Sequence, residues 1–113
     1  MADNIYLDFS EGVKRVMNNT KLYVKLLGKF RGETKLDDLE AALETGDFEK
    51  AQNIAHTIKG LAANLSLTEL FKQSLELEMQ LKEKKVCQSQ MELLKITLEA
   101  TIIEVDKVIN ENG

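Results

Sequence analysis

The chain has 113 residues, enough for one domain with a hydrophobic core and too few for two domains of ordinary size. Hydrophobic residues make up 43% of it and charged residues 30%, proline is absent and glycine occurs only 6 times, which is typical of a folded helical protein and excludes a disordered one. The formal net charge is −4, with 15 basic residues scattered among 19 acidic ones, so we expect no nucleic acid partner.

The sequence also excludes a membrane-spanning helix and an internal disulfide bond. No apolar run approaches the roughly 20 residues that a membrane-spanning helix needs, and residues 1–4 lack the order of a signal peptide. We therefore expect no membrane partner and a cytoplasmic location. Cys87 is the only cysteine, which excludes an internal disulfide and a zinc site built from cysteines. We interpret it as an incidental thiol.

Three short helices are predicted in the first part of the chain. A capping box at residues 8–11 opens the first, which runs to about Met17, where two asparagines follow. Apolar residues at three- and four-residue steps predict a second helix over residues 22–30. Thr34 is expected to cap a third, with apolar positions between residues 36 and 43.

A longer helix is predicted next, over residues 48–65. Gly46 suits the end of the preceding helix, because glycine readily adopts the left-handed conformation found there, and Asp47 suits the N-cap of the new one. A second capping box begins at Ser66 and predicts a tight corner followed by a further helix.

The last helix is expected to open at Ser89 and to continue to about Ile109 on its apolar side. No run shows the sustained two-residue alternation of a strand. The predicted fold class is therefore all-α, an antiparallel four-helix bundle with additional short N-terminal helices.

The only histidine, His56, lies on the fourth predicted helix and faces away from its apolar stripe. At about 100° per residue, His56 projects roughly 130° from the centre of that stripe. Residues three and four positions apart are neighbours on a helix, so Lys59 and Gly60 share its exposed side. Gln52 and Ala63 complete the patch.

This patch has the elements of a phosphoryl-accepting site. A neutral imidazole is a nucleophile, and a carboxylate bonded to Nδ1–H would leave Nε2 free to attack. Glu78 is a candidate for that carboxylate, because it lies only about 50° from the centre of its own helix's apolar stripe and an inward charge needs a partner. Lys59 could neutralise phosphate charge, and Gly60 would let another protein's backbone approach closely. From the residues alone, an ordinary surface of no special chemistry stays equally open.

Residues 55–60, Ala-His-Thr-Ile-Lys-Gly, together with residues 46–48, 62–65 and 77–78, resemble the histidine-containing phosphotransfer (HPt) domains of two-component phosphorelays. The resemblance covers nearly the whole chain, so we expect one HPt-like domain over residues 1–113. The initial methionine and short flanks favour a free-standing protein. The family usually has glycine at the position of Ser66, and we expect this departure to change the corner slightly without loss of function.

The resemblance implies that His56 carries the phosphoryl group, Lys59 stabilises its charge, Glu78 orients the imidazole and Gly60 leaves room for the partner. Because Gln52 and Ala63 complete the same patch, we expect them to meet the partner as well. It implies a phosphorelay intermediate, without kinase activity of its own, that accepts the group from a receiver-domain aspartyl-phosphate and passes it to another receiver aspartate.

The expected partners are response-regulator receiver domains and a hybrid sensor histidine kinase. We expect the chain itself to be a monomer. No phosphate loop or cluster of metal-binding carboxylates is visible in the sequence, so we expect no cofactor or metal in this chain and Mg²⁺ in the receiver. Two alternatives stay open. One is a pseudo-HPt scaffold that binds receiver or kinase domains without carrying phosphate, and the other is a small hydrolase with His56 and Glu78 as an acid–base pair.

Overall fold

A computed structural model describes residues 6–85 and 88–112. These residues form helices and connecting turns and contain no strand. The helices are α1 (Phe9–Arg15), α2 (Thr20–Gly32), α3 (Leu36–Thr45), α4 (Phe48–Asn64), α5 (Thr68–Lys82) and α6 (Gln88–Asn112). None of the helices in this part of the chain is both long and apolar enough to cross a membrane. Cys87 lies outside the described residues.

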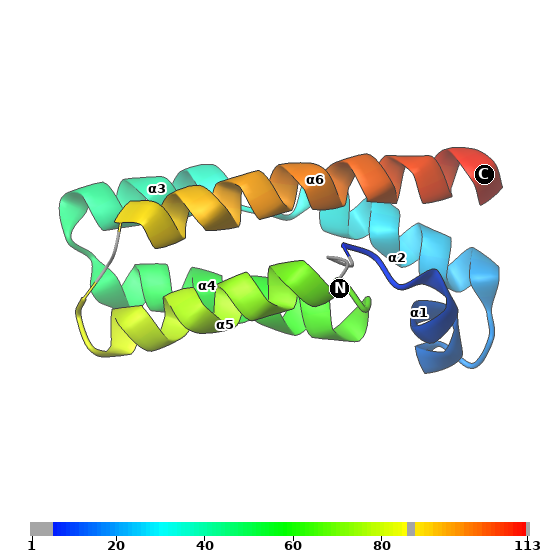
Figure 1. Cartoon of the computed structure of the whole chain (residues 1–113), viewed down its shortest axis with the longest axis horizontal. Coiled ribbons are helices and arrows are strands. Elements are labelled where there is room, and N and C mark those ends of the chain that lie inside the picture. The colour runs from blue at the N-terminus through cyan, green and yellow to red at the C-terminus, as the bar shows by residue number, and fades with distance from the viewer. Residues whose placement is uncertain (1–5, 86–87, 113) are drawn as a thin grey trace, which may run out of the picture.

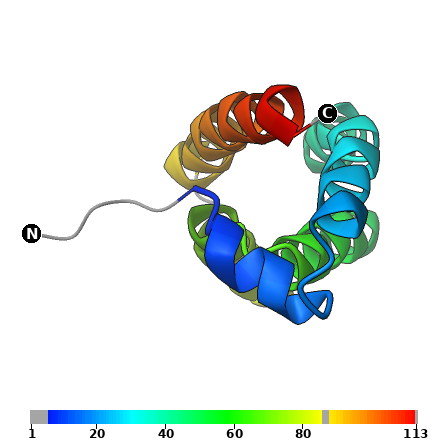
Figure 2. The same ribbon diagram turned by 90° about the vertical axis from the view of Figure 1, so that its right-hand side faces the viewer.

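The helices form an antiparallel bundle whose long rods are α4, α5 and α6 (Figure 1). The fourth side is made by α2 and α3, which follow one another along the bundle (Figure 2). α3 packs against α4, α2 packs against α6, and the most extensive contact joins α4 to α5. α1 is a short helix at one end (Figure 1). The predicted all-α bundle with short N-terminal helices is therefore confirmed.

Small side chains bring α4 and α5 close together. Ala51, Ala55 and Ala62 are all fully buried on the inner face of α4, and Ser74 is fully buried on α5. Helices separated by small residues can approach at the short end of the usual range of 8–10 Å between axes. This close pairing lets side chains of α5 contact side chains of α4, as Glu78 does with His56 and Lys59.

Side-chain caps fix three of the helix starts. Asp8, Asn19 and Asp47 each accept, at 3.1 Å, the backbone N–H of the residue three positions later. Gly46 has a φ of 75° and ends α3 in the left-handed conformation. The predicted starts of α1 and α4 are therefore confirmed.

Other predicted helix ends are wrong. α3 has Lys35 as its N-cap, with a φ of 51° and no side-chain cap bond, so Thr34 does not cap it. Ser66 does not cap α5 either, because the N-cap is Leu67 and makes no side-chain cap bond. α6 already includes Gln88, so Ser89 lies within its first turn.

Ser66 instead ends α4, in the position where helices usually have glycine. Its φ is 57°, in the left-handed region. The backbone N–H of Leu67 donates to the Ala62 carbonyl at 2.9 Å and that of Ser66 to the Ala63 carbonyl at 3.4 Å. This is the Schellman hydrogen-bond pattern, which satisfies the last carbonyls of a helix. The same turn explains why the serine side chain cannot cap the next helix.

The N-terminal segment braces this corner. Asp8 N–H donates to the Ser66 carbonyl at 3.0 Å, and the Tyr23 hydroxyl donates to the Leu65 carbonyl at 2.7 Å. Tyr23 is fully buried against Gly12 of α1, where a β-carbon would overlap its ring. Burial, and secondly the charge of Asp8, raise the pKa of Tyr23 to about 12.

Candidate functional site

His56 projects outward from the middle of α4. Its neighbour Ala55 and the nearby Ile58 are buried in the core, whereas the His56 side chain is 67% exposed. The ring is therefore reachable from solvent while its helix is held firmly by packing.

A buried carboxylate from α5 contacts this ring. Glu78 has a side chain that is only 5% exposed. Its Oε2 lies 2.8 Å from His56 Nδ1, and its Oε1 lies 2.7 Å from Lys59 Nζ. Both carboxylate oxygens are therefore engaged by groups on α4, and the inward charge that the sequence pattern indicated has two partners.

The electrostatics of Glu78 determine the state of the imidazole. Burial raises the pKa of its carboxyl, but the hydrogen bonds and charges of Lys59 and His56 lower it, and the net result lies below the ordinary value of 4.5. Glu78 is thus ionised at neutral pH and can only accept hydrogen bonds. The proton between the two groups belongs on Nδ1 of His56, which leaves the lone pair of a neutral ring on Nε2.

Lys59 lies deeper than the sequence suggested. It was expected on the exposed side beside Gly60, yet its side chain is only 22% exposed and its ammonium is paired with Glu78. The structure therefore brings together the three residues predicted to carry the chemistry, His56, Lys59 and Glu78, with Glu78 at the centre.

The surface beside the imidazole is open. A β-carbon built on Gly60 would meet no atom within 4 Å, so no contact within the described structure requires glycine there. Gln52 and Ala63 are half-buried along the same helix. The role of these three residues in partner binding stays a prediction.

Two apolar side chains on α5 were missed by the sequence analysis. Leu75 and Met79 are 36% and 52% exposed and lie three residues before and one residue after Glu78. Their positions on the helical wheel of α5, between Glu78 and the solvent side, could have revealed them. They give the exposed surface of α5 an apolar component.

The arrangement suits nucleophilic chemistry at nitrogen. Within residues 6–85 and 88–112 there is no group of three or more His, Cys, Asp or Glu side chains that could hold a metal ion. The ring nitrogen of His56 that Glu78 does not contact is Nε2, and the Glu78 anion on the Nδ1 side would stabilise positive charge on the ring.

Comparison with known families decides the classification. The model of the Hpt domain family matches residues 27–104. The chain belongs to the Hpt domain family. No curated protein and no solved structure matches the chain.

Membership assigns a general role to this Hpt domain. The family acts in phosphorelays of two-component systems, where its members are carriers of phosphoryl groups and interact with receiver domains. The match begins within α2 and ends within α6, so α1 lies outside it.

Proposed function

We propose that this Hpt domain is a phosphorelay intermediate whose phosphoryl acceptor is His56. It takes the group from the aspartyl-phosphate of one receiver domain and passes it to the aspartate of another. The observation that carries the proposal is the position of one ring: its Nδ1 faces the ionised Glu78 at 2.8 Å, while the side chain is 67% exposed.

The chemistry balances with the groups available. The Nε2 lone pair of neutral His56 attacks phosphorus, the bond from phosphorus to the aspartyl oxygen breaks, and the receiver regains a free carboxylate. The imidazole becomes positively charged while Nδ1 keeps its proton, and Glu78 stabilises that charge. Transfer to the second receiver reverses these steps. Mg²⁺ belongs to the receiver, where it neutralises charge on the transferring group.

Lys59 contributes positive charge close to the reacting group. It lies one helical turn after His56 and already pairs with Glu78. Its ammonium keeps Glu78 ionised when the imidazole is neutral and adds to the field that attracts phosphate. The first effect stabilises the positive imidazole that the transfer creates, and the second favours the negatively charged phosphoryl group at Nε2.

The receiver is proposed to dock on α4 and α5 around His56. Gly60 offers open space there, and Leu75 and Met79 offer exposed apolar surface. Protein interfaces combine exposed apolar contacts with polar groups and hydrogen bonds, and both are present on this face. Binding on this face requires a monomer, or an oligomer that leaves it uncovered, and a receiver partner would place the chain in the cytoplasm.

The test is to incubate the purified chain with a receiver domain that carries a labelled phosphoryl group. Transfer is measured as label on the chain that is labile in acid and stable in base, as phosphohistidine is. The wild-type chain is expected to take up the label, and His56→Gln to take up none. Transfer that persists undiminished in His56→Gln would contradict the proposal. Binding of the receiver without any phosphohistidine would instead favour the scaffold alternative.

A second variant separates docking from chemistry. Gly60→Leu places a side chain in the open space, so receiver affinity and transfer rate should both fall by about tenfold or more. Phosphorylation by a small donor such as phosphoramidate should be unaffected. An ordinary receiver affinity in Gly60→Leu would refute the docking face.

A further inference from the structure

The outer face of α6 carries an apolar stripe that the other described helices leave exposed. Leu93, Ile96 and Ile103 are 43%, 59% and 58% exposed, and Ala100 lies among them half-buried. The buried residues of α6, among them Leu94, Leu98 and Val105, lie on the other side of the helix. We call these four residues the α6 stripe.

The spacing of the α6 stripe fits a helix as its occupant. Its members follow one another at steps of 3, 4 and 3 residues, which is the heptad spacing of a helix seam. Over three turns the stripe extends about 15 Å along the axis. The small Ala100 near its middle permits close approach of a second helix axis. Isolated exposed apolar residues need no explanation, but four in heptad register form a continuous seam.

Carboxylates flank the stripe. Glu92 and Glu99 are exposed and lie one position before Leu93 and Ala100, where heptad geometry places the residues that meet a partner helix's flanks. No ion pair to either carboxylate is found among the residues that the structure describes. On the other flank, Glu104 makes only a long contact of 3.5 Å with Lys107.

The acidic edge continues onto α3 near the middle of α6. A hollow of about 680 Å³ between the two helices is lined by Asp37 and Asp38 from α3, by Glu99 and Ile103 from α6 and by Lys35. The charge facing an occupant at this point is therefore predominantly negative.

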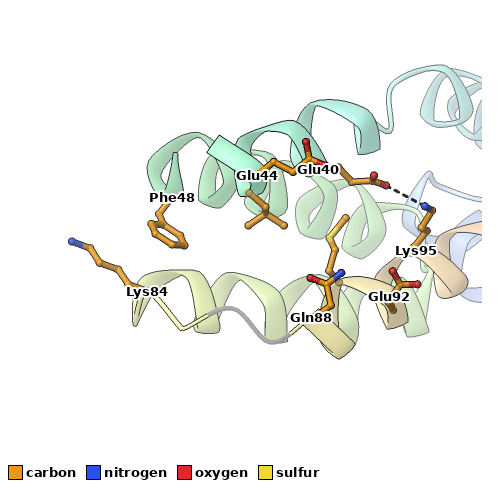
Figure 3. A pocket seen from close by; sticks show the side chains of 9 residues that line it. Glu40, Glu44, Phe48, Lys84, Gln88, Glu92 and Lys95 are labelled. Atoms are coloured by element: carbon orange, nitrogen blue, oxygen red, sulfur yellow. Dashed lines mark ion pairs between the residues drawn. The ribbon is translucent and has the colours of Figure 1, made fainter. Parts of the chain in front are cut away.

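Toward the start of α6 the charge is more nearly balanced, with three glutamates and two lysines between α3 and α6 and in the turn after α5. A second hollow of about 500 Å³ has Glu44 from α3 and Glu92 from α6 among its lining residues (Figure 3). Its Lys95 ammonium pairs with Glu40 at 3.5 Å, as the dashed line in Figure 3 marks. Lys84 also lines the hollow, but at the far side of it from Glu92 (Figure 3).

We propose that the α6 stripe is a docking surface for an amphipathic helix of a partner protein, with basic residues flanking that helix's apolar seam. Charge selects this occupant. A second copy of the chain would bring its own Glu92 and Glu99 against a like-charged flank, and an anionic membrane surface would be repelled. A basic helix would gain ion pairs along the seam.

The position of the stripe separates it from the histidine. α4 and α6 occupy opposite corners of the bundle (Figure 2). A helix bound along α6 would thus leave His56 accessible to a receiver. The proposal does not depend on the phosphoryl-acceptor role of His56, and either can fail without the other.

The test uses two synthetic three-heptad peptides with identical leucine seams, one flanked by lysine and the other by glutamate. Their binding to the full chain is followed by fluorescence anisotropy. The lysine peptide should bind about tenfold more tightly, because several ion pairs of a few tenths of a kcal/mol each add up to that ratio. A higher salt concentration should reduce the difference in affinity between the two peptides, because salt screens exposed charges.

Variants locate the binding. The double variant Ile96→Ser and Ile103→Ser should lower the affinity for the lysine peptide by about tenfold or more. The control, Met17→Ser at an exposed apolar residue between α1 and α2, should bind as the wild type does. Glu92→Lys combined with Glu99→Lys should invert the preference between the two peptides. Circular dichroism confirms that each variant is folded.

Several results would overturn the proposal. These are equal affinity for the two peptides, no binding of the lysine peptide, and binding that survives the Ile96 and Ile103 changes. A dimer in sedimentation that Ile96→Ser dissociates would assign the face to a second copy of the chain instead.

Discussion

Glu78 is a buried carboxylate whose two oxygens are both held from α4, one by His56 and the other by Lys59. This arrangement gives a small exposed patch the features of a prepared nucleophile: a fixed tautomer, a fixed ring orientation and an anion positioned for the charge that develops. The outward direction of His56 and the inward tilt of Glu78 could be predicted from helical periodicity alone. The burial of Lys59 could not, because it depends on the position of α5.

Replacing the carboxylate should release the ring. In Glu78→Ala, the preference for a proton on Nδ1 is lost, and transfer should slow by about tenfold or more, as is usual when an orienting partner is removed. Nitrogen NMR of His56 should show a mixture of tautomers. Unchanged nitrogen shifts together with unchanged transfer would remove Glu78 from the mechanism.

The lowered pKa of Glu78 makes stability depend on pH. A carboxyl group whose pKa is lowered by folding stabilises the protein above its unfolded value, about 4.5, and that contribution is lost as pH falls through the folded value. Urea unfolding from pH 7 to pH 3 should therefore show a smaller loss of stability in Glu78→Gln than in the wild type. Parallel curves for the two proteins would contradict this assignment.

At the scale of elements, the starts of α1, α2 and α4 follow rules that involve a single residue, and Asp8, Asn19 and Asp47 form side-chain caps there. The corner between α4 and α5 shows where local rules fail. Ser66 fits a capping box in sequence, but the Schellman turn places it at a φ of 57°. Which of two adjacent residues becomes the cap depends on how α5 packs, and this information is not local.

The strain at Ser66 predicts a stabilising substitution. A left-handed conformation costs a residue other than glycine about 1–2 kcal/mol. Ser66→Gly removes that cost, but glycine also has more backbone entropy in the unfolded chain, which offsets part of the gain. The free energy of unfolding should therefore rise by about 0.5–1 kcal/mol.

Ser66→Ala is the matched control, since it loses the 3.4 Å contact of the Ser66 hydroxyl with Glu11 but keeps the strain. It should not be stabilising. If both variants destabilise equally in urea unfolding, the hydroxyl contact outweighs the strain.

For the whole molecule, the number and type of the long helices could be predicted because their periodicity extends over many turns. The arrangement of α2 and α3 along one side could not be predicted, because it depends on the turn at Lys35, whose φ is 51°. The bracing of the α4–α5 corner by α1 and Tyr23 was also missed, since it joins residues far apart in sequence.

That bracing is testable at Gly12. A β-carbon there would overlap the buried Tyr23 ring, so Gly12→Ala should lower the free energy of unfolding by about 1–3 kcal/mol. In Gly32→Ala, by contrast, the new β-carbon meets nothing within 4 Å, and stability should be unchanged or slightly higher. Equal stability of the two variants in urea unfolding would show that α1 is not packed as described.

Nε2 of His56 is the atom proposed to accept the phosphoryl group. The most direct measurement is nitrogen and phosphorus NMR of the chain after treatment with phosphoramidate, which needs no partner protein. We predict a bond between phosphorus and Nε2 of His56, with Nδ1 still protonated and bonded to Glu78. A phosphoryl group on Nδ1, on another side chain or on none would contradict the claim.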